Sequence, residues 1–163
     1  WSTYVRRDSL RFESFYASAS SDGQRLFSIA RSGKVVALSA SNGRILWTRV
    51  QQGLGYTTPA VSSGRVFVGG FDGALHAYDA RSGRTLWTRT VGGRVLGAPV
   101  QIGGLVFFAT LEQKTYAVRA VDGKPVWKIG MGKYSPTIAT RERYYMTLNG
   151  ILVAFRARNS PSP

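Results

Sequence analysis

The stretch GRILWTRV, residues 43 to 50, returns as GRTLWTRT at residues 83 to 90, and a looser copy, GKPVWKIG, begins at residue 123. The three copies start 40 residues apart. A fixed interval of this size is typical of repeat architectures, in which each copy forms one supersecondary unit. The chain is therefore interpreted as a tandem repeat, and its copies are aligned with one another.

The repeat extends well beyond this stretch. RLFSIARSGKVVALSASNG (25–43) aligns with RVFVGGFDGALHAYDARSG (65–83) and with LVFFATLEQKTYAVRAVDG (105–123). Corresponding positions are Phe27, Phe67 and Phe107, then Ala37, Ala77 and Ala117, then Trp47, Trp87 and Trp127. A fourth copy, shifted by 37 residues, aligns Tyr144 with the phenylalanines and contains Gly150, Ala154 and Ala157. The chain thus contains four copies of one unit.

Each unit has the signals of four short strands. In the second copy, TTPAV, VFVG, LHAYDA and TLWTRT are separated by the turn sequences SSGR, FDG and RSG. Short β-rich segments joined by glycine-containing turns indicate antiparallel hairpins. Four strands in about 40 residues, repeated in tandem, indicate a propeller blade. The sequence predicts an all-β fold, a β-propeller of four-stranded antiparallel blades.

The pattern A-x-D-A-x-x-G-x-x-x-W appears as AYDARSGRTLW at 77–87 and, weakened, as ALSASNGRILW and AVRAVDGKPVW. It resembles the repeat of PQQ-like (quinoprotein-type) β-propellers, and the resemblance covers residues 17–157. This family includes quinoprotein alcohol dehydrogenases and a non-enzymatic branch with an outer-membrane assembly lipoprotein. The resemblance implies that each tryptophan packs against a neighbouring blade near a repeat glycine. The blade-sealing residues expected on this basis are Trp47, Trp87, Trp127, Gly43, Gly83 and Gly123.

The fourth copy ends before a fourth strand, since LVAFRA is followed by RNSPSP, and residues 158–163 are predicted to be a disordered tail. Residues 1–16 supply a candidate strand, WSTYV, and an enlarged loop, RRDSLRFE, expected to complete a neighbouring or the last blade. Three arrangements are open: a closed ring of four blades, two copies paired in a larger ring, or the C-terminal half of a longer propeller. The resemblance favours half of a ring of about eight blades.

Composition narrows the possible chemistry. Cysteine is absent, which excludes disulfides and thiolate sites, and no apolar run approaches the roughly 18 residues of a membrane span. No phosphate-binding loop or nucleophile elbow is found. The single histidine, His76, aligns with strand positions and is interpreted as packed and locally hydrogen-bonded, and Asp79 as a structural acceptor.

No catalytic, cofactor-binding or metal-binding residue is therefore predicted. By resemblance, quinoprotein enzymes hold a quinone and calcium with a Glu, an Asn and an Asp, and the residues expected for that site were not found. The protein is interpreted as non-enzymatic and without a cofactor.

Basic side chains are the remaining candidates. There are 22 Lys and Arg against 8 Asp and Glu, a formal charge of +14, which attracts anionic partners over a distance. In an antiparallel meander the first and third turns share a rim. Cations predicted on this rim are Arg25, Arg44, Arg65, Arg81, Arg84, Lys124, Arg141 and Arg143. Nucleic acid is disfavoured, because the regular aromatic positions indicate core rather than base-stacking platforms.

The function expected from this reading is a non-catalytic scaffold that binds a protein partner, or a second copy completing the ring, through a loop-bearing basic face. The resemblance places it outside the cytoplasm, as a secreted, periplasmic or cell-surface protein. The alternatives are a binder of an anionic polymer or membrane surface, and a fragment of a PQQ-dependent dehydrogenase.

Overall fold

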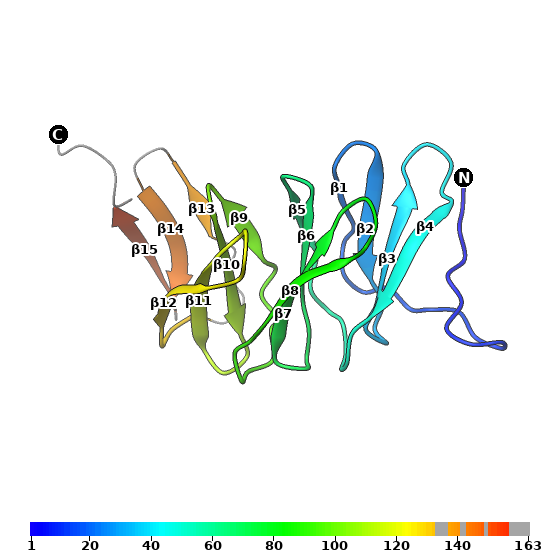
Figure 1. The fold of residues 1–163 in the computed structure, drawn as a ribbon. Helices are drawn as coiled ribbons and strands as arrows, with labels where there is room; N and C mark the ends of the chain where they lie inside the picture. The colour runs from blue at the N-terminus through cyan, green and yellow to red at the C-terminus, as the bar shows by residue number, and fades with distance from the viewer. Residues whose placement is uncertain (133–136, 141–142, 149, 157–163) are drawn as a thin grey trace.

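The computed structural model describes residues 1–132, 137–140, 143–148 and 150–156, and the regular structure within them is entirely β-strand. The strands form four antiparallel sheets, each a meander in chain order, arranged side by side in an arc (Figure 1). The predicted all-β propeller fold is confirmed.

The first three sheets have four strands each. The first contains β1 (Ser20–Ser21), β2 (Arg25–Ile29), β3 (Lys34–Ser39) and β4 (Ile45–Val50). The second contains β5 (Ala60–Ser62), β6 (Arg65–Gly69), β7 (Ala74–Asp79) and β8 (Thr85–Thr90). The third contains β9 (Val100–Ile102), β10 (Leu105–Thr110), β11 (Lys114–Arg119) and β12 (Pro125–Ile129). We call these sheets blades 1 to 3.

The fourth sheet, blade 4, has three described strands: β13 (Ile138–Ala139), β14 (Arg143–Leu148) and β15 (Ile151–Arg156). The N-terminus lies beside blade 1 and the C-terminal strand β15 lies at the opposite end of the arc (Figure 1). The described part of the chain contains no element that could cross a membrane as a long apolar helix.

The three full blades share one strand register. In blade 1, Phe27 lies opposite Ala37, which lies opposite Trp47. The corresponding residues of blades 2 and 3 pair in the same way, and in each blade the register shifts immediately after the alanine. A shift of this kind is a β-bulge, which sharpens the local twist of the outer strand. Equal registers place equivalent side chains at equivalent points of every blade.

The core lies between successive blades. Phe27, Phe67 and Phe107 are at most 1% exposed, as predicted for core positions. Between blades 1 and 2, Phe27 and Trp47 pack with Val66, Val68 and Tyr78 of blade 2. Alternating side chains of a strand point to opposite faces, so each blade contributes one face to the core before it and the other to the core after it.

The alignment of Tyr144 with the repeated phenylalanines was wrong by one residue. Phe107 lies opposite Ala117, whereas Ala154 lies opposite Tyr145, and Tyr144 lies opposite Phe155. The cause is a shorter β14–β15 turn, in which Leu148 pairs with Ile151. A slip of one residue moves a side chain to the other face of a sheet. Tyr144 accordingly faces blade 3, with its ring centroid 5.2 Å from that of Phe107.

Candidate functional site

Tryptophan and glycine join successive blades at the outer strands. The indole Nε1 of Trp47 donates to the carbonyl of Ala80 at 3.1 Å, and Trp87 Nε1 donates to Ala120 at 3.1 Å. Each of these two indoles contacts a turn glycine of the next blade. A Cβ on Gly83 would lie 2.6 Å from Trp47 Cδ2, closer than side chains approach one another. Trp127 packs on Phe155 of β15 at 6.3 Å between centroids.

The residue two positions after the tryptophan adds a second link. Arg49 Nη2 donates to the carbonyl of Ser82 at 3.3 Å, and Arg89 Nε donates to the carbonyl of Gly123 at 2.8 Å. Both arginines extend from an outer strand to the glycine turn of the next blade. These two side chains are therefore structural.

We call the edge with the β1–β2 and β3–β4 turns, and their equivalents, the first rim. Since strands of a meander alternate in direction, the predicted basic residues of the first and third turns lie on this rim. Arg25 pairs there with Asp22 at 2.9 Å, and Arg65 Nη1 donates to the Ser63 carbonyl at 3.4 Å. Salt bridges among the described residues include none of Arg44, Arg81, Arg84, Lys124 and Arg143. Arg141 lies outside the described residues.

Aspartates in the turns offset part of this charge. Asp79 Oδ1 accepts from the backbone N–H of Ser82 at 2.8 Å and from its hydroxyl at 2.7 Å, and these bonds lower the pKa of Asp79. Hydrogen bonding to Arg119 lowers the pKa of Asp122 to about 2. Both carboxylates are thus held ionised as turn acceptors, the structural role expected for Asp79.

The enlarged N-terminal loop forms a β-hairpin, which we call the N-terminal hairpin (residues 5–13). Arg6 and Phe12 form an antiparallel bridge, and the N–H of Glu13 donates to the carbonyl of Val5 at 2.8 Å. Asp8 Oδ1 closes the tip by accepting from the backbone N–H groups of Leu10 and Arg11, each at 2.9 Å. Aspartate is favoured in turns because it makes such local bonds.

The hairpin is fixed to blade 1 at its base. Lys34 Nζ lies 3.2 Å from Glu13 Oε1, and it also donates to the carbonyl of Arg6. The Glu13 side chain is only 1% exposed. The N–H of Arg31 donates to the carbonyl of Ser14 at 2.8 Å. These contacts place the hairpin beside the β2–β3 turn, on the edge opposite the first rim, which we call the second rim (Figure 1).

The hairpin presents apolar and basic side chains to solvent. Leu10 at the tip is 89% exposed and Phe12 52%, and Tyr4, which directly precedes the hairpin, is 73% exposed. The ring of Phe12 packs on Tyr4 at 5.2 Å between centroids, and the Arg6 guanidinium lies 5.4 Å from the Phe12 centroid. Exposed aromatics beside arginine are the composition that distinguishes protein interfaces from ordinary surface.

An aromatic stripe lies along the second rim and begins at Tyr16, three residues after the N-terminal hairpin. Tyr16, Tyr56 and Phe71 follow one another at centroid distances of 6.0 and 5.3 Å. The guanidinium of Arg94 then lies 6.0 Å from the Phe71 centroid, and its Nε is 3.1 Å from Glu112 Oε1. The stripe therefore runs along the second rim from the blade 1–2 junction to blade 3.

His76 is hydrogen-bonded on both ring nitrogens. Nε2 lies 2.7 Å from Asp72 Oδ2, and Nδ1 lies 3.1 Å from Thr88 Oγ1. Its ring stacks on Tyr78 at 6.1 Å between centroids, and burial raises the pKa of Tyr78 to about 12. This agrees with the interpretation of His76 as packed and locally satisfied.

A family profile described as outer membrane protein assembly factor BamB matches residues 1–89 and, in a second overlapping alignment, residues 50–160. The chain belongs to the BamB family of PQQ-like β-propellers. No curated protein sequence matches it significantly.

Solved structures show the same fold. BamB from Moraxella catarrhalis superposes with a TM-score of 0.76 at 19% identity, over 87% of this chain and 50% of that one. The computationally designed Ika4 protein gives a TM-score of 0.77 at 13% identity, over 88% and 91%. Quinohemoprotein alcohol dehydrogenase ADHIIG from Pseudomonas putida HK5 gives 0.69 at 20% identity, over 83% and 28%. This chain spans half the length of the BamB structure.

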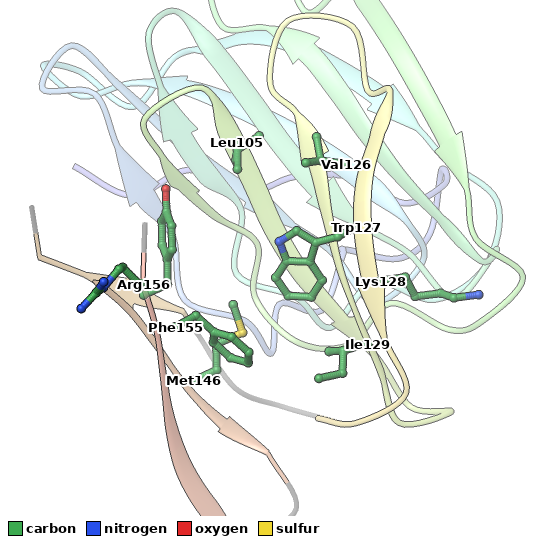
Figure 2. Close-up of a pocket in the computed structure, with 9 residues that line it drawn as sticks. Leu105, Val126, Trp127, Lys128, Ile129, Met146, Phe155 and Arg156 are labelled. Carbon is green, nitrogen blue, oxygen red and sulfur yellow. The ribbon is translucent and has the colours of Figure 1, made fainter. Parts of the chain in front are cut away.

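The described residues of this BamB-family chain do not fit a quinone and calcium site. They contain no group of three His, Asp or Glu side chains that could hold one metal ion. The side chain of Asn42 is used by its own turn, where it accepts from the N–H of Arg44 at 3.1 Å. Asn149 and Asn159 lie outside the described residues. A groove of about 610 Å³ between blades 3 and 4 is lined mainly by apolar side chains such as Trp127, Met146 and Phe155 (Figure 2).

Sequence reasoning placed the candidate site on the first rim and missed the exposed hairpin and stripe of this BamB-family chain. A signal was present: 18 residues separate Trp1 from Ala19, against 12 from Trp47 to Pro59, and YVRRDSLRFESFY concentrates aromatics and arginines. The placement of that segment depends on the contact of Glu13 with Lys34, which the repeat alignment does not contain.

Proposed function

We propose that this protein is a non-catalytic β-propeller scaffold that acts outside the cytoplasm and binds a protein partner through its second rim. The observation that carries the proposal is the N-terminal hairpin, whose tip residue Leu10 is 89% exposed on a fixed, salt-bridged base. A leucine side chain held in solvent does not stabilise the fold. Burying it against a partner would stabilise the complex by about 1.5–3 kcal/mol. The aromatic stripe extends the same surface.

The family supports the partner class and the location. Its profile describes an outer membrane protein assembly factor, so we propose components of the outer-membrane assembly machinery as the partner. The ring is proposed to contain about eight blades, since this chain of four blades spans half the length of the BamB structure. A second copy or a longer chain would supply the additional blades.

Binding of purified wild-type and variant protein to the isolated outer-membrane assembly complex, at fixed salt, tests the proposal. Leu10→Asp is expected to weaken binding at least tenfold, about 1.4 kcal/mol. Arg84→Glu, on the first rim, is the control and is expected to leave the affinity within about twofold. Loss of binding in Arg84→Glu with normal binding in Leu10→Asp would assign the partner to the first rim instead.

An anionic polymer or membrane surface is the second candidate. The supporting observation is a set of exposed cations on the first rim that form no salt bridge with a described residue: Arg44, Arg81, Arg84 and Lys124. Such an array would bind by charge alone, and its affinity would fall steeply with salt. Catalysis by a bound quinone has no comparable support among the described residues.

A further inference from the structure

A groove of about 510 Å³ lies between the outer strands of blades 2 and 3. One wall comes from Arg89 near the end of β8 and from Val91 just after it. The other wall comes from β11 and β12 of blade 3. Both blades are complete four-stranded sheets, and a groove of this volume is typical of a site for a small ligand.

The groove arises where a tyrosine of the repeat is replaced by valine. Tyr78 in blade 2 and Val118 in blade 3 occupy the same register position, opposite Val66 and Val106. At the blade 1–2 junction, Tyr78 packs on Trp47 at 6.2 Å between ring centroids and is buried. Val118 has no ring to place between β8 and β12, so the blade 2–3 junction keeps an open space there.

A second replacement puts a cation beside this space. Lys128 pairs with Tyr116 in blade 3 at the position where Thr88 pairs with His76 in blade 2. Lys128 is exposed and forms no salt bridge with a described residue. Figure 2 shows its side chain extending away from Met146 of blade 4. Because side chains alternate along a strand, Lys128 and Val126 face blade 2.

The lining of the groove is basic and apolar. Arg89 supplies a second cation, and the described residues that line the groove include no Asp or Glu. Val91, Val118 and Val126 supply apolar surface between the two cations. A carboxylate is held most strongly by such charged donors, and a hydrocarbon chain is stabilised by burial against valine.

The polar neighbours do not cancel this charge. Burial raises the pKa of Tyr116, so its hydroxyl stays neutral at pH 7, and it donates to the Val91 carbonyl at 3.3 Å. Glu112 acts on Tyr116 electrostatically, but its carboxylate is already paired with Arg94 at 3.1 Å. An anion entering the groove would therefore meet a positive field.

We propose that the blade 2–3 groove binds a free monocarboxylate with an unbranched apolar chain. The carboxylate lies between Lys128 and Arg89, and the chain lies along Val91, Val118 and Val126. A groove between two strands accepts a single chain, whereas a membrane surface is bound by apolar side chains that protrude from the protein. This site is separate from the second-rim surface proposed to bind a protein.

Titration of the isotopically labelled protein with sodium decanoate, below the concentration at which decanoate forms micelles, tests the proposal. We expect saturable amide shifts in the NMR spectrum that centre on Val91, Val118 and Val126. Octanoate, shorter by two methylenes, should bind about 15-fold more weakly. Decan-1-ol has the same chain without the charge and should bind at least tenfold more weakly than decanoate.

Two variants exchange groove residues for their counterparts in blade 2. Val118→Tyr fills the groove, and Lys128→Thr removes its exposed cation; each should weaken decanoate binding at least fivefold. Lys124→Thr, which removes the same charge from the first rim, is the matched control and should leave the affinity within twofold. Leu10→Asp should also leave it unchanged, so that failure of this site and failure of partner binding are seen separately.

Several results would overturn the inference. They are the absence of saturable shifts, equal affinities for decanoate and decan-1-ol, and an equal loss of affinity in Lys124→Thr and Lys128→Thr. Because Lys128 is exposed, its replacement should fold even if Val118→Tyr does not, and unchanged decanoate binding in Lys128→Thr would also count against the site. Binding to vesicles of phosphatidylglycerol without binding to free decanoate would assign the charge to a membrane surface instead.

Discussion

Glycine at the turn before each outer strand serves two purposes at once. Gly83 has a φ of +69°, a conformation that L side chains adopt only with strain. It also leaves room for the Trp47 indole, as Gly123 does for Trp87 and Gly43 for Trp1. The Gly–Trp spacing could be recognised from the sequence because the turn conformation and the room for the indole are both required of the same glycine in every copy. Trp1 was placed in the candidate strand WSTYV, although its glycine lies 42 residues away instead of 36.

Substitution of Gly83 by alanine should destabilise the protein more than the backbone conformation alone explains. Gly64 has nearly the same φ, +72°, but a Cβ there meets nothing within 4 Å. Gly64→Ala should therefore cost only the left-handed strain, about 1 kcal/mol. Gly83→Ala should cost about 1–3 kcal/mol more because Trp47 must move. Urea unfolding of both variants measures the difference, and equal losses would show that the indole contact contributes nothing.

Asp122 should make the folded state more sensitive to acid. The hydrogen bond from Arg119 lowers the folded-state pKa of Asp122 to about 2, from 3.8. A carboxylate with a lowered pKa stabilises the fold fully above pH 3.8, and this contribution is lost as pH falls through about 2. Asp122→Asn keeps an acceptor for the N–H of Lys124 but removes the charge, so its stability should fall less between pH 4 and 2. Thermal unfolding of the wild type and of Asp122→Asn across this range measures the effect. If the Asp122–Arg119 pair did not contribute, the melting temperatures of the two proteins would fall in parallel with pH.

Strand order within a blade is the feature of the elements that sequence predicts best. Turn glycines and β-rich segments mark each strand, and the tandem copies confirm one another. The strand registers of blades 1 to 3 followed from the alignment, but the register of blade 4 did not. Its β14–β15 turn is one residue shorter, which moves the side chains of β14 to the opposite face of the sheet, and no clear sequence signal marks the change. The N-terminal hairpin was predicted only as a loop, since its folding depends on Asp8 closing the tip and on Lys34 of another element.

Glu13 should hold the hairpin against blade 1. Its side chain is 1% exposed beside Lys34, whereas Glu112 is 36% exposed beside Arg94. Removing one partner from a buried pair costs more than removing one from an exposed pair, which contributes about 0–1 kcal/mol. Glu13→Gln should therefore accelerate hydrogen exchange of the Glu13 and Arg31 amides, which bond across the hairpin base, at least about tenfold.

Glu112→Gln is the matched control for this experiment. It removes the same charge on the same rim, at a distance from the hairpin, and should leave exchange of the Glu13 and Arg31 amides unchanged. Equal acceleration in both variants would assign the effect to net charge instead of to the buried pair.

The whole molecule divides its surface into two rims of different composition. The first rim has turns in which basic side chains alternate with aspartates that bond to the backbone. The second rim has the hairpin and the aromatic stripe, with arginines placed against rings. The inter-blade seals were predictable because they repeat, and the second-rim surface was not, because it occurs once.

Long-range attraction of anions should be a property of the whole molecule and not of one rim. The formal charge is +14, and at physiological salt its field extends about 8 Å. Reversing three arginines of the first rim (Arg44, Arg81 and Arg84 to Glu) or three of the hairpin (Arg6, Arg7 and Arg11 to Glu) changes the net charge equally. Both variants should lose heparin affinity to a similar degree, and both should show a shallower dependence of log affinity on log salt than the wild type. If only the first-rim variant lost affinity, that rim would be a specific anion site, and the anionic-polymer function would replace the scaffold.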